Sequence, residues 1–204
     1  MEDSLNQRLR KFKDDCLNES HDLVVQRYLL DGPAYFFEKK REDEFLFKRD
    51  IAEALGIHIR DIAIVGSGKL GFSIKPDESV LSYYPFNYFD QIKTSDLDVA
   101  IISPSLFDKQ LRRLFEYTAQ YTNQNVWPTN RSRNFLAQYA LKGWIVPEYL
   151  PSQYRISDQI EDVQTKYEHQ FKREINIGIY KSWYFFEKYH IGNVLNIHVN
   201  LIAA

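Results

Sequence analysis

The sequence predicts an α+β fold in which a few short strands alternate with amphipathic helices. Two apolar runs, at residues 61–66 and 96–102, and one strictly alternating segment at 173–180 have the patterns of strands. Most of the remaining chain carries apolar residues at helical spacing. Because 204 residues can bury a substantial core, we predict a single domain over residues 1–204. Its predicted parts are a helical N-terminal extension at 1–34 and a core at 35–204 with an insert at 76–92.

The composition excludes several classes of protein. The 26 basic and 28 acidic residues give a net charge of -2, without the global basic bias that dedicated duplex-DNA binders often show. Cys16 is the only cysteine, which excludes an internal disulfide and a multi-cysteine metal site. No span approaches the roughly 18 continuous apolar residues of a membrane helix, and the charged start is no secretory signal. We therefore expect a soluble, cytoplasmic protein without a membrane partner.

The N-terminal quarter reads as helical. Apolar residues at helical spacing run from 4 to 30, and an interruption at 18–20 would give two helices or one bent helix. The Asp-Gly-Pro sequence at 31–33 is a helix stop signal. A second helix is predicted over 35–55, with Phe45 among its inward residues and a run of charged residues on its solvated face.

The middle of the chain predicts two strands separated by a long irregular segment. The first strand, at 61–66, leads into the glycine-rich turn 66–71, and a short strand at 72–74 can follow. Residues 76–92 combine prolines, Asn87 and several tyrosines without a clean period, so we predict a loop. The continuous apolar tail of the strand at 96–102 suits a buried position in the sheet.

The C-terminal half predicts further helices and one strand. Pro104 is expected to end the strand before it, and Ser105 to cap a helix over 106–121. The expected inner side chains of that helix are Leu106, Leu111, Leu114, Phe115 and Ala119. A helix around 133–141, the strand at 173–180 and an aromatic helix from about 183 to 190 complete the prediction.

The glycine-rich string at 66–71 satisfies the G-x-G-x-x-G pattern of a dinucleotide-binding turn, but the match is weak. That fingerprint needs a helix at the third glycine, whereas the next residues read as extended and Pro76 would disrupt a helix there. Protein kinases have a similar glycine loop, but their other signatures are absent from this sequence. A Walker A loop fails because Gly71 is followed by Phe72 and Ser73.

The two carboxylates of Asp96 and Asp98 help to decide which kind of nucleotide site the glycine-rich string belongs to. Residues i and i+2 of a strand project to the same side, so both acids share one face while Leu97 and Val99 enter the core. Two like charges so close are unfavourable unless a cation neutralises them, which favours a shared Mg²⁺ site. The competing interpretation is a pair of capping or surface acids at the start of a strand.

Val65-Gly66-Ser67, followed by Asp96-Leu97-Asp98 in an apolar strand, resembles the signature of the DNA polymerase β-like nucleotidyltransferase superfamily. The resemblance covers residues 40–105, and the strand at 173–180 extends it. It implies a small mixed β-sheet with flanking helices, and two Mg²⁺ ions, or Mn²⁺, held by Asp96 and Asp98. It further implies that Gly66 and Ser67 bind the triphosphate of an NTP or dNTP. The long interval between the two motifs makes 76–92 an insertion beside the active site.

The resemblance leaves other site residues open. The family usually has a third carboxylate on a neighbouring strand, and Glu174 is our candidate because it shares its parity with Asn176. The alternatives are Asp158, Glu161 and Asp162. Lys69 follows the turn and either contacts the triphosphate or is simply solvated. The arginines at 112, 113, 131 and 133 form either a phosphate-binding patch or a salt-bridged helix surface.

The expected activity is therefore a nucleotidyltransferase that transfers a nucleoside monophosphate to a hydroxyl and releases pyrophosphate. Small members of this superfamily include enzymes of bacterial antiviral defence that make nucleotide signals or short oligonucleotides, antitoxin-type enzymes that nucleotidylate a partner protein encoded nearby, and antibiotic adenylyltransferases. The aromatic insert and the arginines slightly favour an oligonucleotide product or a nucleic-acid end as acceptor. The alternative from another class is a non-catalytic module that binds a nucleotide or a partner.

Overall fold

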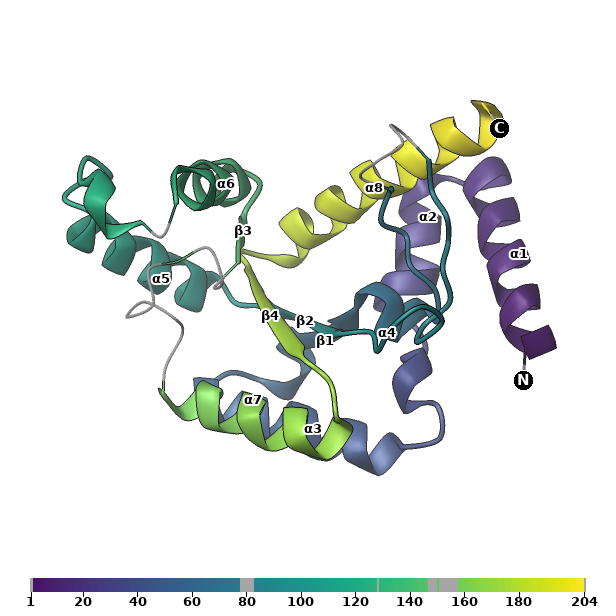
Figure 1. Ribbon diagram of the computed structural model, residues 1–204, viewed down its shortest axis with the longest axis horizontal. Helices are drawn as coiled ribbons and strands as arrows, with labels where there is room; N and C mark the ends of the chain where they lie inside the picture. Colours follow the sequence, from purple (N-terminus) through teal and green to yellow (C-terminus); the bar gives the residue numbers. More distant parts are fainter. Residues whose placement is uncertain (1, 78–82, 128, 147–149, 151–157, 204) are drawn as a thin grey trace. The chain divides into compact units, whose positions relative to one another are not determined.

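A four-stranded sheet with strand order β1-β2-β4-β3 organises the described part of the chain (Figure 1). The computed structural model describes residues 2–77, 83–127, 129–146, 150 and 158–203. The strands are β1 (Ile62–Val65), β2 (Leu97–Ile102), β3 (Trp144–Ile145) and β4 (Ile175–Tyr180). β3 is antiparallel to β4, with Trp144 opposite Tyr180. The predicted α+β class with a small mixed sheet is confirmed, and of these four strands only the two-residue β3 was not predicted.

Helices make up most of the remaining described residues. The α-helices are α1 (Glu2–Asn18), α2 (His21–Val25), α3 (Arg41–Leu55), α4 (Gly66–Leu70), α5 (Pro104–Tyr117), α6 (Asn130–Leu141), α7 (Asp158–Phe171) and α8 (Trp183–Ala203). A π-helix spans Gln26–Leu30, and 3₁₀ turns span Tyr35–Phe37, Ile59–Asp61 and Gln124–Val126. Among the helices in the described ranges, none combines the length and the hydropathy needed to cross a membrane.

The chain forms two compact units, each assembled from stretches that are far apart in sequence. The first unit contains Met1–Asp43, Ile64–Asp98 and Glu187–Ala204. The second unit contains Glu44–Ala63 and Val99–Phe186. The predicted N-terminal extension therefore belongs to the same unit as the predicted insert and most of α8.

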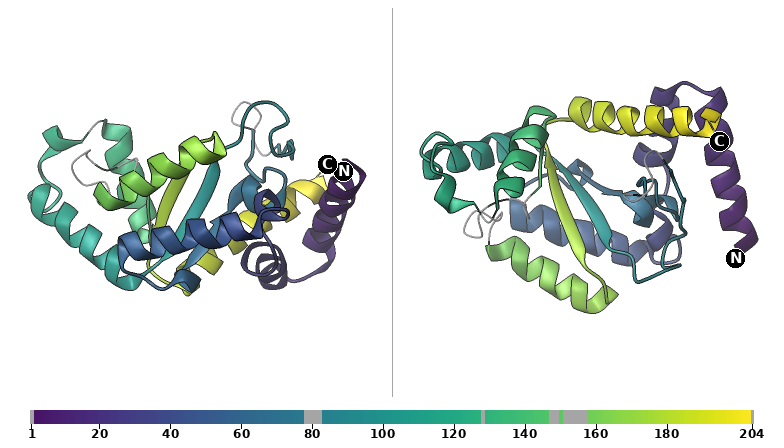
Figure 2. Two further views of the ribbon diagram at one scale, coloured as in Figure 1. Left: turned by 90° about the horizontal axis from the view of Figure 1, so that it is seen from below. Right: turned by 45° about the horizontal axis from the view of Figure 1, so that its top comes forward.

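The first unit has a core to which both chain ends contribute. Its buried side chains are Phe12, Cys16, Val24, Val25, Leu29, Leu70, Phe72, Tyr84, Phe86, Val194 and Ile197. The Nδ1 atom of His198 on α8 donates to the Cys16 carbonyl of α1 at 2.8 Å, and Figure 2 shows these helices beside each other. Since Cys16 is fully buried, its thiol has a pKa raised to about 12 by burial and by the charge of Asp15, and is unreactive.

The predicted insert is not a free loop, because two of its aromatic residues belong to that core. Tyr84 and Phe86 are 9% and 4% exposed. They lie on an arm that pairs back on residues 71–77: Phe72 bridges Tyr88, and the Ser73 amide donates to the Asn87 carbonyl at 2.8 Å. Tyr84, Phe86 and Tyr88 are spaced two residues apart, and the first two are buried while Tyr88 packs partly buried against the core, as in a half-buried strand. Residues 78–82 of the insert lie outside the described residues.

In the second unit, α3 and α7 lie side by side, as both figures show. The ring of Phe47 packs at 4.8 Å from that of Tyr167, between their centroids. Beside this contact, Asp50 accepts hydrogen bonds from Lys166 at 2.6 Å and from the Tyr167 hydroxyl at 2.9 Å. α7 also holds the start of β4, since Glu168 accepts the Ile175 amide at 3.0 Å.

Two predicted helices differ from the observed ones in register. The segment at 35–55 breaks after a 3₁₀ turn and resumes as α3 at Arg41, so Phe47 and Ile51, four residues apart, face the core while Phe45 is 49% exposed. The predicted inward position of Phe45 is therefore wrong. The interruption near residue 18 is confirmed, and Ser20 caps α2 by accepting the Leu23 amide.

The helix predicted from 106 begins two residues earlier. Ser103 is its cap, accepting the Leu106 amide at 3.3 Å, and Pro104 occupies the first turn, where its missing N–H costs nothing. The inner residues are consequently Phe107, Gln110 and Leu114. Leu111 and Phe115, predicted to face inward, are 40% and 54% exposed. The strand ends before Pro104 as predicted, but the predicted cap at Ser105 is wrong.

Candidate functional site

The glycine-rich string forms a short helix, where the sequence predicted an open turn. β1 ends at Val65, and α4 begins at once with Gly66, whose φ is +63°. Gly71 closes the helix with a φ of +90° and donates its amide to the Ser67 carbonyl at 2.8 Å. Glycine suits both ends because L side chains rarely adopt such angles. The helix thus starts at the first glycine, unlike the dinucleotide-binding fingerprint, which needs one at the third.

Gly66 and Asp98 are in direct contact. A methyl group at Gly66 would overlap the Asp98 oxygen Oδ2 and would lie 3.2 Å from its carboxyl carbon. One turn on, a methyl group at Gly68 would lie 2.7 Å from Cδ1 of Leu97. The helix α4 therefore packs with its glycines against the first two residues of β2. The fold brings together the two motifs that the sequence separates by the insert.

The chain approaches Asp96 through a closed turn. The Asp90 carboxylate accepts the Ser95 amide at 2.8 Å, and the Ser95 hydroxyl accepts the Asp90 amide at 3.0 Å. Leu97 is fully buried and Val99 is 2% exposed, whereas Asp96 and Asp98 are half-buried. This alternation puts the two acids on the face opposite the two apolar side chains. Asp96 itself lies one residue before β2.

The carboxylate pair suits a magnesium ion that arrives with a nucleotide. Mg²⁺ is usually bound by one or two carboxylates together with substrate phosphates and water, seldom by a cage of protein ligands alone. Asp96 and Asp98 supply such a donor set, and Mn²⁺ accepts the same ligands. Within the described residues, no group of three or more His, Cys, Asp or Glu side chains is arranged to hold a metal ion.

Lys69 is buried and binds backbone carbonyls. Only 5% of this residue is exposed, and its Nζ donates to the carbonyls of Asp31 and Gly32 at 2.7 and 2.6 Å. The carbonyl of Lys69 accepts Nη2 of Arg8 at 3.2 Å, and the same guanidinium pairs with Glu38. The contacts tie α4 to α1 and to the turn after the π-helix. They favour a structural role over the predicted contact with a triphosphate.

Glu174 lies in a different environment. It is exposed and precedes β4 by one residue, on the strand face that Asn176 and Gly178 also occupy. The indole of Trp144 covers the far end of this face: a methyl group at Gly178 would overlap its Nε1, and the ring stacks on Tyr180. Glu174 belongs to the second compact unit, and the carboxylate pair to the first. The alternatives Asp158, Glu161 and Asp162 lie on α7.

The predicted arginines make local contacts. Arg112 lies 3.9 Å from Glu116, with both side chains well exposed. Arg131 lies over the ring of Phe135, and Arg133 over that of Tyr121. The Arg112 pair is that of a solvated helix surface, where exposed ion pairs contribute little to stability, whereas Arg133 is half-buried.

Sequence reasoning missed Phe89 as a neighbour of the glycine helix. Its ring would lie 3.8 Å from a methyl group at Gly68, and its amide donates to the Gly71 carbonyl at 2.9 Å. The rings of Tyr35 and Phe36 lie 6.0 and 5.9 Å from it, measured between centroids. The signal that indicates this arm is the spacing of Tyr84, Phe86 and Tyr88 at every second position, as in a strand.

These contacts define the candidate site by its geometry alone. Gly66 and Ser67 begin α4, Asp98 lies against Gly66, and Asp96 shares the face of Asp98. Comparison of the chain with protein-family models, with curated proteins and with solved structures finds no match.

Proposed function

We propose that this protein is an Mg²⁺-dependent nucleotidyltransferase that transfers a nucleoside monophosphate from an NTP or dNTP to a hydroxyl. The observation that carries the proposal is the contact between the Asp98 carboxylate and the backbone of Gly66. A residue without a side chain beside a carboxylate lets phosphate groups approach the backbone where a metal-binding acid is held. Phosphoryl transfer needs mainly such positioning and charge neutralisation.

Each residue of the site has a proposed role. Asp96 and Asp98 bind Mg²⁺ or Mn²⁺, which when bound neutralises negative charge on the triphosphate. Gly66 and Ser67 contact the phosphates that leave as pyrophosphate. The acceptor oxygen forms a bond to the α-phosphorus as the bond to pyrophosphate breaks, and Glu174 is the proposed base for the hydroxyl proton. Lys69 holds α4 in place through Asp31 and Gly32.

The proposed acceptor is an oligonucleotide or another nucleic-acid end, as in enzymes that make nucleotide signals in bacterial defence. Its support is the set of aromatic residues in the insert, on which bases can stack where a ring is exposed. Fewer aromatic rings are available for stacking than the sequence predicts. Tyr84 and Phe86 are buried, and the exposed aromatic residue next to them is Tyr83, at 52% exposure. A hydroxyl of a partner protein is the alternative acceptor.

The test is an assay of the whole chain with each α-labelled NTP and dNTP, with Mg²⁺ or Mn²⁺. We expect metal-dependent release of pyrophosphate and a labelled product whose size distinguishes an oligonucleotide from a modified protein. Asp98→Asn removes the charge at constant size and should abolish both signals. Asp108→Asn, an exposed acid on α5, is the matched control and should act as wild type. No pyrophosphate with any nucleotide, alone or with the protein encoded nearby, would leave the non-catalytic binding module as the better interpretation.

A further inference from the structure

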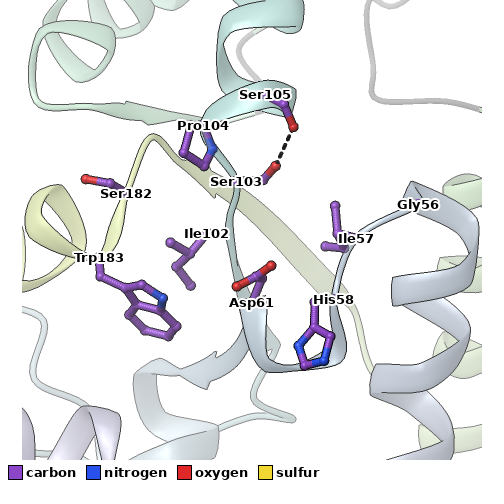
Figure 3. Close-up of a pocket in the computed structure, with 10 residues that line it drawn as sticks. All are labelled: Gly56, Ile57, His58, Asp61, Ile102, Ser103, Pro104, Ser105, Ser182 and Trp183. Atoms are coloured by element: carbon purple, nitrogen blue, oxygen red, sulfur yellow. Dashed lines mark hydrogen bonds between the residues drawn. The ribbon is translucent and has the colours of Figure 1, made fainter.

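The second unit contains a pocket whose lining includes none of the residues proposed above for nucleotidyl transfer. Three junctions of the chain enclose it: the connection from α3 to β1, the start of α5 after β2, and the start of α8 after β4 (Figure 3). Its volume is about 410 Å³. Sites for small molecules commonly measure about 300–1,000 Å³, so the pocket has room for a nucleoside or an amino acid side chain with its backbone.

Hydrogen bonds and ring contacts within the unit fix the walls of the pocket. The Ser103 amide donates to the Tyr180 carbonyl at 3.0 Å, and the Ser103 hydroxyl lies 3.2 Å from that of Ser105. The indole of Trp183 meets the buried ring of Phe186 edge-on, with their centroids 5.7 Å apart. A ligand would therefore enter a site in which Ser103, Ser105 and Trp183 are already held, which limits the entropy lost on binding.

The chemistry of the lining combines an aromatic face with a carboxylate. The indole of Trp183 is 38% exposed. Figure 3 shows the Asp61 carboxylate pointing into the pocket, with Trp183 on one side and His58 on the other. Within the described part of the chain, the Asp61 side chain makes no hydrogen bond or ion pair, and no lysine or arginine lines the pocket. A half-buried carboxylate of this kind is best satisfied by N–H donors of a ligand.

His58 adds a donor to the same wall. Its Nδ1 accepts the Arg60 amide at 3.2 Å, so in the neutral imidazole the proton is on Nε2. The hydroxyl of Ser105, with its neighbour Ser103, can accept or donate. The pocket thus offers one strong acceptor at Asp61, a stacking face at Trp183, and weaker polar groups around them.

We propose that this pocket binds a planar group with two adjacent N–H donors, as found in the guanine ring and in the guanidinium of arginine. Both donors would bond the two oxygens of Asp61, while the planar group stacks on Trp183. A ligand with one donor between two acceptors, such as uracil, would leave a carboxylate oxygen facing an acceptor. The proposal is independent of the transfer activity, since none of its residues belongs to the transfer site.

The test measures binding to the full chain by ligand-observed NMR and by quenching of tryptophan fluorescence. The probes are guanosine and N-acetyl-arginine amide, with uridine as the comparison ligand. We expect one of the two probes, or both, to bind at millimolar concentration and uridine to bind at least about tenfold more weakly. Binding of guanosine alone would identify a nucleobase as the natural occupant, and binding of the arginine derivative alone a guanidinium; either supports the proposal.

Substitutions of the lining residues test whether the probes bind in this pocket. Asp61→Asn replaces one acceptor oxygen by a donor and should weaken binding by about tenfold or more, whereas Asp108→Asn should leave it unchanged. Trp183→Phe keeps a stacking ring and should lose less affinity than Trp183→Ala. Circular dichroism and thermal unfolding check that each variant folds. The proposal is overturned if neither probe binds, if uridine binds as well as the probes, or if a folded Asp61→Asn variant binds as wild type does.

Discussion

The two compact units each contribute a predicted carboxylate near the start of a strand, but they hold it differently. In the first unit, Asp98 is half-buried and rests on the backbone of Gly66, in a contact that any side chain at that position would disturb. In the second unit, Glu174 is exposed and precedes β4. A carboxylate that the fold holds against a backbone is better placed to bind a metal than one that moves freely in solvent. Five predictions test how the two units differ and whether the transfer site is placed correctly.

The largest effect is expected at Asp98. Replacing it by asparagine removes a metal-binding charge without changing the packing on Gly66, so pyrophosphate release should fall by about a thousandfold. The unfolding midpoint should change little, because the side chain keeps its size. Steady-state pyrophosphate release and thermal unfolding measure the two effects. A variant that retains wild-type activity would remove Asp98 from the site.

As the pH falls, the first unit should begin to lose stability at a higher pH than the second unit. His190 is buried, and burial lowers the pKa of its imidazole to about 4, below the value of 6.5 that it has when unfolded. Because the unfolded chain takes up this proton and the folded chain does not, stability is complete above about pH 6.5 and falls as the pH drops towards 4. At about 1.4 kcal/mol per tenfold change in proton affinity, the loss approaches about 3 kcal/mol.

The second unit should lose stability only in a lower pH range. Burial raises the pKa of Asp50, but hydrogen bonds from Lys166 and Tyr167 outweigh this and leave the pKa below its usual value. Its stabilising effect is therefore present above the unfolded pKa near 4 and is lost only as the pH falls further. Hydrogen exchange, read peptide by peptide between pH 7 and 4, should show α8 losing protection before α3 and α7. His190→Leu should remove the difference; simultaneous loss in wild type would contradict it.

Glu174 should matter less than Asp98. If it takes the proton of the attacking hydroxyl, Glu174→Gln should lower the rate by about a hundredfold, with little change in KM. Glu161→Gln, on the exposed surface of α7, is the matched comparison. A rate that is unchanged in the first variant and reduced in the second would move the third carboxylate to α7.

The smallest effect is expected for Lys69. Lys69→Met keeps the bulk but leaves the Asp31 and Gly32 carbonyls without their donor, which should cost about 2 kcal/mol of stability. Lys75→Met, at an exposed lysine nearby, should cost almost nothing. Denaturant unfolding measures both. If Lys69→Met is as stable as wild type but binds nucleotide weakly, then Lys69 contacts the triphosphate as the sequence predicted.

Local patterns predicted the strands and the approximate helices well, since apolar periodicity depends on neighbouring residues. The pairing of Gly66 with Asp98 followed from the family signature rather than from periodicity. The errors have two other causes: the cap of α5 at Ser103 sets which side chains face inward, and β3 is too short to have a pattern.

Side-chain direction was beyond the reach of the sequence. Nothing in the spacing shows that Lys69 turns towards Asp31, or that Tyr84 and Phe86 enter a core shared with α1 and α8. The pocket around Asp61 was missed for the same reason, because its lining comes from three junctions that are separate in the chain.

The most direct test compares two glycines that have the same backbone conformation. Gly66 and Gly56 both have a φ of +63°, but a methyl group at Gly56 meets nothing within 4 Å, whereas one at Gly66 meets the Asp98 carboxylate. Backbone strain should cost each alanine variant about 1 kcal/mol of stability, and the overlap with Asp98 adds to that cost at Gly66. We predict that Gly66→Ala loses pyrophosphate release by about a hundredfold and that Gly56→Ala keeps it. Equal activity in the two variants would contradict a transfer site built on Gly66 and Asp98.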